Sequence, residues 1–237
     1  MKVTSSWANL FRLVEAGRSS LLNLNPEHTR VAINTMRARL TILGFNLAII
    51  TFQISNTRGL GGGTRLDGFE TTVHLSTGTV LLIGLALTIA SMVVFIASSS
   101  FDREGTCDGR MLLAGDMLMY LALAQTVSGF FSSYARVMEV LLIETEVAQA
   151  ALSTIHIGIA IIGSTVWAIV IYAGPIVSLA RSSHTRVTKL AHTAGYFAIL
   201  IFISHLWRAA QQIEGRAIAS EGSLSAWFNA FAAPLYW

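Results

Sequence analysis

Charged residues are scarce in this chain of 237 residues, where they make up 12% of the sequence. Soluble globular proteins carry about 25% charged residues. The sequence therefore lacks about half of the side chains that usually cover a water-exposed surface. Hydrophobic residues make up 53% of the chain, a composition that excludes a disordered protein. The shortage of charge predicts an integral membrane protein in contact with a lipid bilayer.

Cysteine is nearly absent, and several sequence motifs of disulfide, metal and catalytic sites are absent as well. The single Cys107 cannot form an internal disulfide, and no Cys-x-x-Cys pair occurs. The His-Glu-x-x-His helix of zinc proteases and the Gly-x-Ser-x-Gly turn of hydrolases are also missing. The net charge of +3 is explained better by membrane orientation than by binding to nucleic acid. The sequence thus predicts neither a disulfide scaffold nor a nucleic-acid partner, and it shows no familiar catalytic set.

Long apolar runs are abundant. A helix needs about 20 mostly apolar residues to cross a hydrocarbon core about 30 Å thick. Five stretches meet this requirement, at residues 31–54, 72–98, 111–133, 147–173 and 190–207. No segment alternates between polar and apolar residues over a sustained length, as a half-buried strand does. We therefore predict an all-α, polytopic membrane protein whose transmembrane domain covers residues 26–210.

The two terminal segments, residues 1–25 and 211–237, have helical amphipathic patterns rich in aromatic residues. Apolar residues recur at helical spacing at Trp7, Leu10, Phe11 and Val14, and again at Leu224, Trp227, Phe228 and Phe231. Such helices either lie in the membrane interface or pack on a partner subunit. Both interpretations stay open from the sequence.

The distribution of basic residues predicts the orientation. If the amino terminus lies inside, 11 of the 16 Lys and Arg residues fall on the inner side. Because inner loops carry the excess of basic residues, we predict a cytoplasmic amino terminus and a carboxyl terminus on the opposite side. The membrane itself is expected to be a bacterial inner membrane or an organelle membrane.

Polar and small residues recur along one face of three of the predicted helices. In the first span, Arg39, Asn46 and Gln53 are seven residues apart. In the second span, the face consists of His74, Thr77, Gly84, Thr88, Ser91 and Ser98. In the fourth span, it consists of Gln149, Ser153, His156, Ala160, Gly163 and Gly174. Polar groups are costly in lipid, so these faces are expected to point into the bundle.

Asp116 is the acidic residue inside the third span. A carboxyl group at this depth must be protonated, paired or functional. If the carboxyl group is paired, Arg39 is the nearest basic candidate by depth, since both residues lie toward the inner side. A structural ion pair and a proton-carrying role are both compatible with the sequence.

Two hypotheses explain the polar faces. Small residues and hydroxyls pack membrane helices together, which suits a non-catalytic subunit of a larger membrane complex, with other membrane subunits or further copies of the chain as partners. Alternatively, the faces line a path for ions or protons. Candidate residues for that path are Asn46, Gln53, His74, Thr88, Asp116 and His156.

Histidines suggest a third hypothesis, a pigment-binding protein. With alternating spans, His74 and His205 fall near the same level. Two such imidazoles could hold a haem or a chlorophyll-type pigment between helices. His192 and His205 cannot share a metal, because thirteen helical steps separate them by about 20 Å.

Overall fold

The computed structural model describes residues 26–56, 73–101, 109–144 and 149–214. These residues form helices and contain no strand, which confirms the predicted all-α fold. Five of the helical segments are long and apolar enough to cross a membrane. The predicted terminal helices, at residues 1–25 and beyond Glu214, lie outside the described residues.

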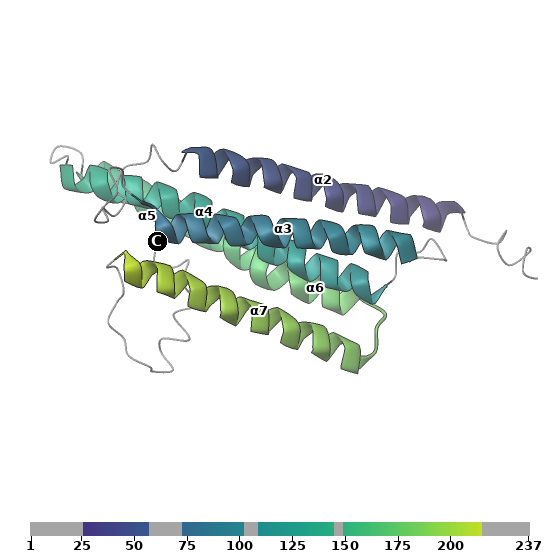
Figure 1. Cartoon of the computed structure of the whole chain (residues 1–237). Coiled ribbons are helices and arrows are strands. Elements are labelled where there is room, and N and C mark those ends of the chain that lie inside the picture. Colours follow the sequence, from purple (N-terminus) through teal and green to yellow (C-terminus); the bar gives the residue numbers. More distant parts are fainter. Residues whose placement is uncertain (1–25, 57–72, 102–108, 145–148, 215–237) are drawn as a thin grey trace, which may run out of the picture.

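The long segments run side by side, with successive segments pointing in opposite directions (Figure 1). The bounds are α2 (Pro26–Asn56), α3 (Leu75–Phe101), α4 (Arg110–Glu144), α5 (Gln149–Ala168), η2 (Ile169–Ala173), α6 (Gly174–Arg181) and α7 (Arg186–Ile213). The fourth long segment comprises α5, η2 and α6, because the chain stays helical from one to the next.

Three of the long segments extend well beyond the predicted spans, and one of them is α7, which covers Arg186–Ile213 where 190–207 was predicted. α4 continues to Glu144 rather than ending near Ser133, because the residues after Ser133 include no glycine or proline that would break a helix. The fourth segment was expected to end before Gly174-Pro175, but it continues through them to Arg181. Pro175 lies in the first turn of α6, directly after the wider π turn η2, so its missing N–H falls at an irregular part of this continuous helix.

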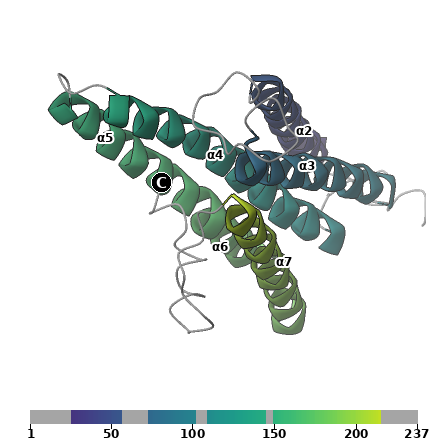
Figure 2. The same ribbon diagram turned by 60° about the vertical axis from the view of Figure 1, so that its left-hand side comes forward.

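α4 is the central helix of the bundle. It contacts α2, α3, α5, η2, α6 and α7, whereas α2 and α7 lie on opposite sides of the α3–α4 pair (Figures 1 and 2). This position explains why Asp116 and Gln125, on opposite sides of α4, are both buried. One apolar cluster joins α4 to η2 and α7 around Leu121 and Ile171, and another joins α2, α3 and α4 around Phe95.

Candidate functional site

The predicted polar faces of the first two long helices point into the bundle. On α3 and at the residue just before it, every position of the expected face is buried: His74, Thr77, Leu81, Gly84, Thr88, Ser91, Phe95 and Ser98. On α2, Asn46 is 2% exposed, and Leu43 and Ile50 are buried on either side of it. We call Arg39, Asn46, Thr88, Ser91 and Asp116, which meet where α2, α3 and α4 pack together, the polar seam.

Of the alternatives left open for Asp116, the structure shows pairing, and the partner is the candidate Arg39. Nη2 of Arg39 donates a hydrogen bond to Oδ2 of Asp116 at 2.9 Å, and Nε lies 2.7 Å from Oδ1. The guanidinium group also lies over the ring of Phe95 on α3, 5.6 Å from its centroid. The aspartate side chain is 8% exposed. One charge pair and one aromatic ring therefore join all three helices at this level.

Further along the seam, an amide and a hydroxyl bond to each other. Nδ2 of Asn46 donates to Oγ1 of Thr88 at 2.8 Å, and this hydroxyl donates to the Gly84 carbonyl at 2.7 Å. The threonine hydroxyl thus acts as acceptor and donor at once. The contact links α2 to α3 and satisfies polar atoms that would be costly in an apolar interior.

α3 and α4 approach closely beside these bonds. Oγ of Ser91 donates to the Gly115 carbonyl at 2.8 Å. A carbonyl within an α-helix is reachable from a neighbouring helix when the backbone there is uncovered, and Gly115 has no side chain to cover it. The hydroxyl and the glycine therefore act together as an interhelical contact.

At the opposite end of α3, Glu214 caps the helix. Its Oε1 accepts a 2.9 Å hydrogen bond from the Ser76 N–H, and both residues are buried. The carboxylate thus binds one of the N–H groups that a helix leaves without a partner at its start. This role was not predicted, since Glu214 follows the predicted fifth span and no motif indicates its partner.

The Ser76–Glu214 bond also sets the relative level of His74 and His205. His74 lies two residues before Ser76 and is buried, whereas His205 lies nine residues before Glu214 on α7 and is exposed. Nine helical steps correspond to about 14 Å. The two imidazoles are therefore at different levels of the bundle, and this geometry does not favour their holding one haem or pigment between them.

Besides His74, two predicted pathway residues, Gln53 and His156, lie outside the polar seam. Gln53 is half-buried on α2 and borders a groove whose remaining lining, from α2 and α4, includes Phe45, Phe52 and Phe130. His156 is half-buried on α5, and its Nε2 has no hydrogen-bond partner within the part of the chain that the structure describes.

A second polar contact that the sequence did not predict stabilises the irregular turn η2. The Tyr196 hydroxyl of α7 donates to the Ile171 carbonyl at 2.7 Å. Ile171 lies four residues before Pro175, so its carbonyl is the one that an N–H at position 175 would bind in a regular helix. The proline could have indicated that this carbonyl needs a donor, but nothing in the sequence selects Tyr196 as that donor.

We expect Tyr196→Phe to lower the free energy of unfolding by about 1–3 kcal/mol, because it leaves the buried Ile171 carbonyl without this donor. Tyr134→Phe, at an exposed position on α4, is the matched control and should change stability by less than about 0.5 kcal/mol. Titration with a denaturing detergent measures both values. Equal effects of the two variants would contradict the role given to the Tyr196 hydroxyl.

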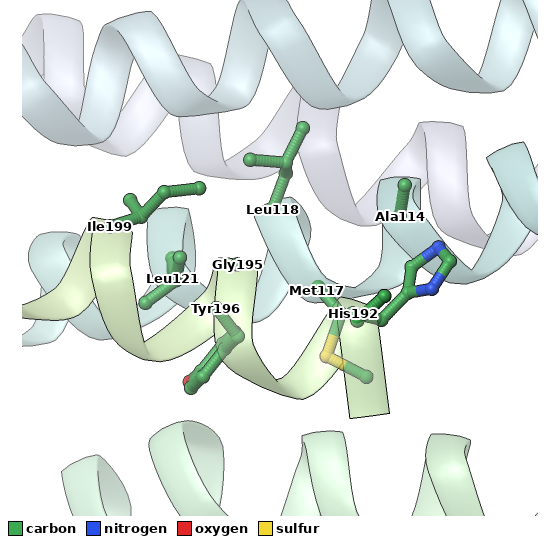
Figure 3. A pocket seen from close by; sticks show the side chains of 9 residues that line it. Ala114, Met117, Leu118, Leu121, His192, Gly195, Tyr196 and Ile199 are labelled. Atoms are coloured by element: carbon green, nitrogen blue, oxygen red, sulfur yellow. The ribbon is translucent and has the colours of Figure 1, made fainter. Parts of the chain in front are cut away.

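A groove of about 340 Å³ lies between α4 and α7 (Figure 3). Its lining is apolar except for His192 and Tyr196. Nδ1 of His192 lies 2.8 Å from the Thr188 carbonyl, and Nε2 lies 3.2 Å from the Arg110 carbonyl at the start of α4. His192 therefore connects α7 to α4 at one end of the groove.

Among the described residues, no group of three or more His, Cys, Asp or Glu side chains could hold a metal ion. The polar seam instead consists of donors and acceptors that bind one another across helix interfaces. Such an arrangement fixes the rotation and register of the helices.

Comparison with known proteins gives no relative: no protein-family model, curated protein or solved structure matches the chain.

Proposed function

We propose that this protein is a non-catalytic subunit of a larger membrane complex, and that it contributes a rigid bundle of five transmembrane helices. The observation that carries the proposal is the internal pairing of the polar seam. Arg39 bonds to Asp116, Asn46 bonds to Thr88, and Ser91 bonds to a backbone carbonyl. These bonds hold helices together, which is the task of a scaffold.

The proposed orientation has the amino terminus on the cytoplasmic side. It rests on the excess of Lys and Arg at the predicted inner ends of the spans, which is made up of Lys2, Arg12, Arg18, Arg30, Arg37, Arg39, Arg103, Arg110, Arg181, Arg186 and Lys189. The structure is compatible with it, because successive long segments run in opposite directions (Figure 1).

An ion or proton path is supported less well than packing. Of its six candidate residues, Asn46 and Thr88 are bonded to each other, and Asp116 is bonded to Arg39. His156 lies on α5, which packs against α4 away from the seam. Conduction by these residues remains a prediction without an observation that favours it over helix packing.

The test is gentle detergent extraction of the tagged full chain from its native membrane. We expect other integral membrane proteins to co-purify in fixed ratio. A destabilised variant, Arg39→Met, should lose these partners if they recognise the intact bundle. Recovery of the wild-type chain as a monomer or as a homo-oligomer alone would overturn the proposed function.

A further inference from the structure

α4 and α5 extend together beyond the end of the bundle at which α3 begins (Figures 1 and 2). Leu81 of α3 lies against Gly129 of α4, and the two helices are antiparallel. Five steps back from this contact on α3 reach Ser76, and five steps forward on α4 end just before residue 135. Residues 135–144 of α4 therefore continue for about 15 Å past the level of Ser76. We call them, together with residues 149–158 of α5 that run back beside them, the α4–α5 extension.

The α4–α5 extension is apolar although it lies beyond the lipid tails. α3 has 27 residues and is about 40 Å long, which already exceeds a hydrocarbon core of about 30 Å. The extension starts level with the end of α3 and points away from it. Even so, Ile155 and Ile157 on α5 are 47% and 57% exposed, and residues 149–158 include no charged side chain. An exposed apolar surface outside the lipid indicates that another protein segment covers it.

His156 gives an independent indication that a segment is bound here. It lies between the two exposed isoleucines, and its Nε2 is shielded from solvent without a hydrogen-bond partner among the described residues. Polar atoms in such positions are nearly always hydrogen-bonded in folded proteins. The covering segment is therefore expected to bring a hydrogen-bonding group to this imidazole.

The chain that follows Glu214 starts where the α4–α5 extension starts. The 2.9 Å hydrogen bond from the Ser76 N–H to Oε1 of Glu214 holds the end of α7 at this level. The next nine residues, 215–223, can span up to about 30 Å when extended. This reach is twice the length of the extension, so whatever follows residue 223 can lie anywhere along it.

Residues 224–233 have the pattern and the length that this surface requires. Their apolar stripe consists of Leu224, Trp227, Phe228 and Phe231, and none of the ten residues is charged. Ser223 stands at a position that favours the start of a helix, and Pro234 at one that favours its end. Ten helical residues are about 15 Å long, which equals the length of the α4–α5 extension.

We infer that residues 224–233 form a helix that lies along the α4–α5 extension and covers it with the aromatic stripe. The indole N–H of Trp227 is a donor that an unprotonated Nε2 of His156 can accept. Residues 57–72 follow α2 at the same end of the bundle, but they include five glycines and four charged residues and have no such stripe. The inference goes beyond the proposed function, because the contact is made within one chain and requires no other subunit.

Photo-cross-linking of the full chain in its native membrane tests the contact. Benzoylphenylalanine in place of Phe228 keeps the phenyl ring and reacts with neighbouring C–H bonds under light. We expect an adduct of monomer mass whose linked peptides fall within residues 135–144 or 149–158. The matched control carries the same probe at Asn229, on the other side of the proposed helix, and should not react with the α4–α5 extension.

Every outcome of the cross-linking decides the inference. An adduct with lipid alone would place residues 224–233 in the membrane interface and overturn the contact. An adduct with a second copy or with residues outside the extension would overturn it too, as would equal yields from the probes at Phe228 and Asn229. An adduct with a different subunit would overturn the inference but support the proposed function, so the two fail separately.

A variant of the surface provides a second test. Ile157→Glu should lower the yield of the Phe228 adduct by about tenfold or more, because docking would then bury a charge without a partner. Val187→Glu makes the same change at an exposed position on α7, at the opposite end of the bundle, and should leave the yield unchanged. An undiminished yield in Ile157→Glu would contradict contact with this face of α5.

Discussion

Replacing Arg39 by methionine is expected to lower the free energy of unfolding by about 3–5 kcal/mol. The change removes one partner of a buried ion pair and leaves the Asp116 carboxylate uncompensated between helices. It also removes the guanidinium group from the face of Phe95. The expected loss is therefore large for a single substitution. Unfolding by a denaturing detergent, followed by circular dichroism, measures it.

Two controls separate the pair from a general effect of charge. Arg37→Met changes an exposed arginine on the same helix and should cost less than about 0.5 kcal/mol. The double variant Arg39→Met, Asp116→Leu removes both charges and should recover much of the lost stability, as buried ion pairs replaced by apolar residues often do. If the double variant is as unstable as Arg39→Met alone, the uncompensated charge is not the cause.

Gly129→Ala is expected to destabilise the protein, although alanine favours helix more than glycine does. An added Cβ would lie 2.5 Å from Cδ2 and 2.8 Å from Cγ of Leu81, whose side chain is fully buried on α3. Forcing α3 and α4 apart costs about 1–3 kcal/mol, more than the roughly 1 kcal/mol gained in helix propensity. The same detergent titration gives the free energy of unfolding.

Gly44→Ala is the matched control, because its Cβ would meet no atom within 4 Å. It should stabilise the protein by up to about 1 kcal/mol through helix propensity. Combining Gly129→Ala with Leu81→Ala should cost less than the sum of the two single changes, since each relieves the crowding that involves the other. Additive costs would contradict the close contact of α3 and α4 at this point.

The sequence by itself determined the helical class, the number of long apolar segments and the inward faces of two of them. The length of an apolar run decides whether a helix can cross a bilayer, and this length depends only on consecutive residues in the sequence. The burial of Asn46, Thr88 and Ser91 followed from their spacing, because a seven-residue period keeps side chains on nearly one face of a helix. Depth along the spans made Arg39 the nearest basic candidate for Asp116, whereas the ion pair itself is shown by the structure.

Tertiary structure alone decided which distant groups meet at the helix ends and at the irregular turn. The cap of Ser76 by Glu214 and the donor to the Ile171 carbonyl, Tyr196, depend on how far α7 slides and rotates against its neighbours. The same register places His205 at a different level from His74. The rotation and sliding of the helices are set by the packing of many side chains on several helices. The spacing of residues within one helix therefore does not predict them.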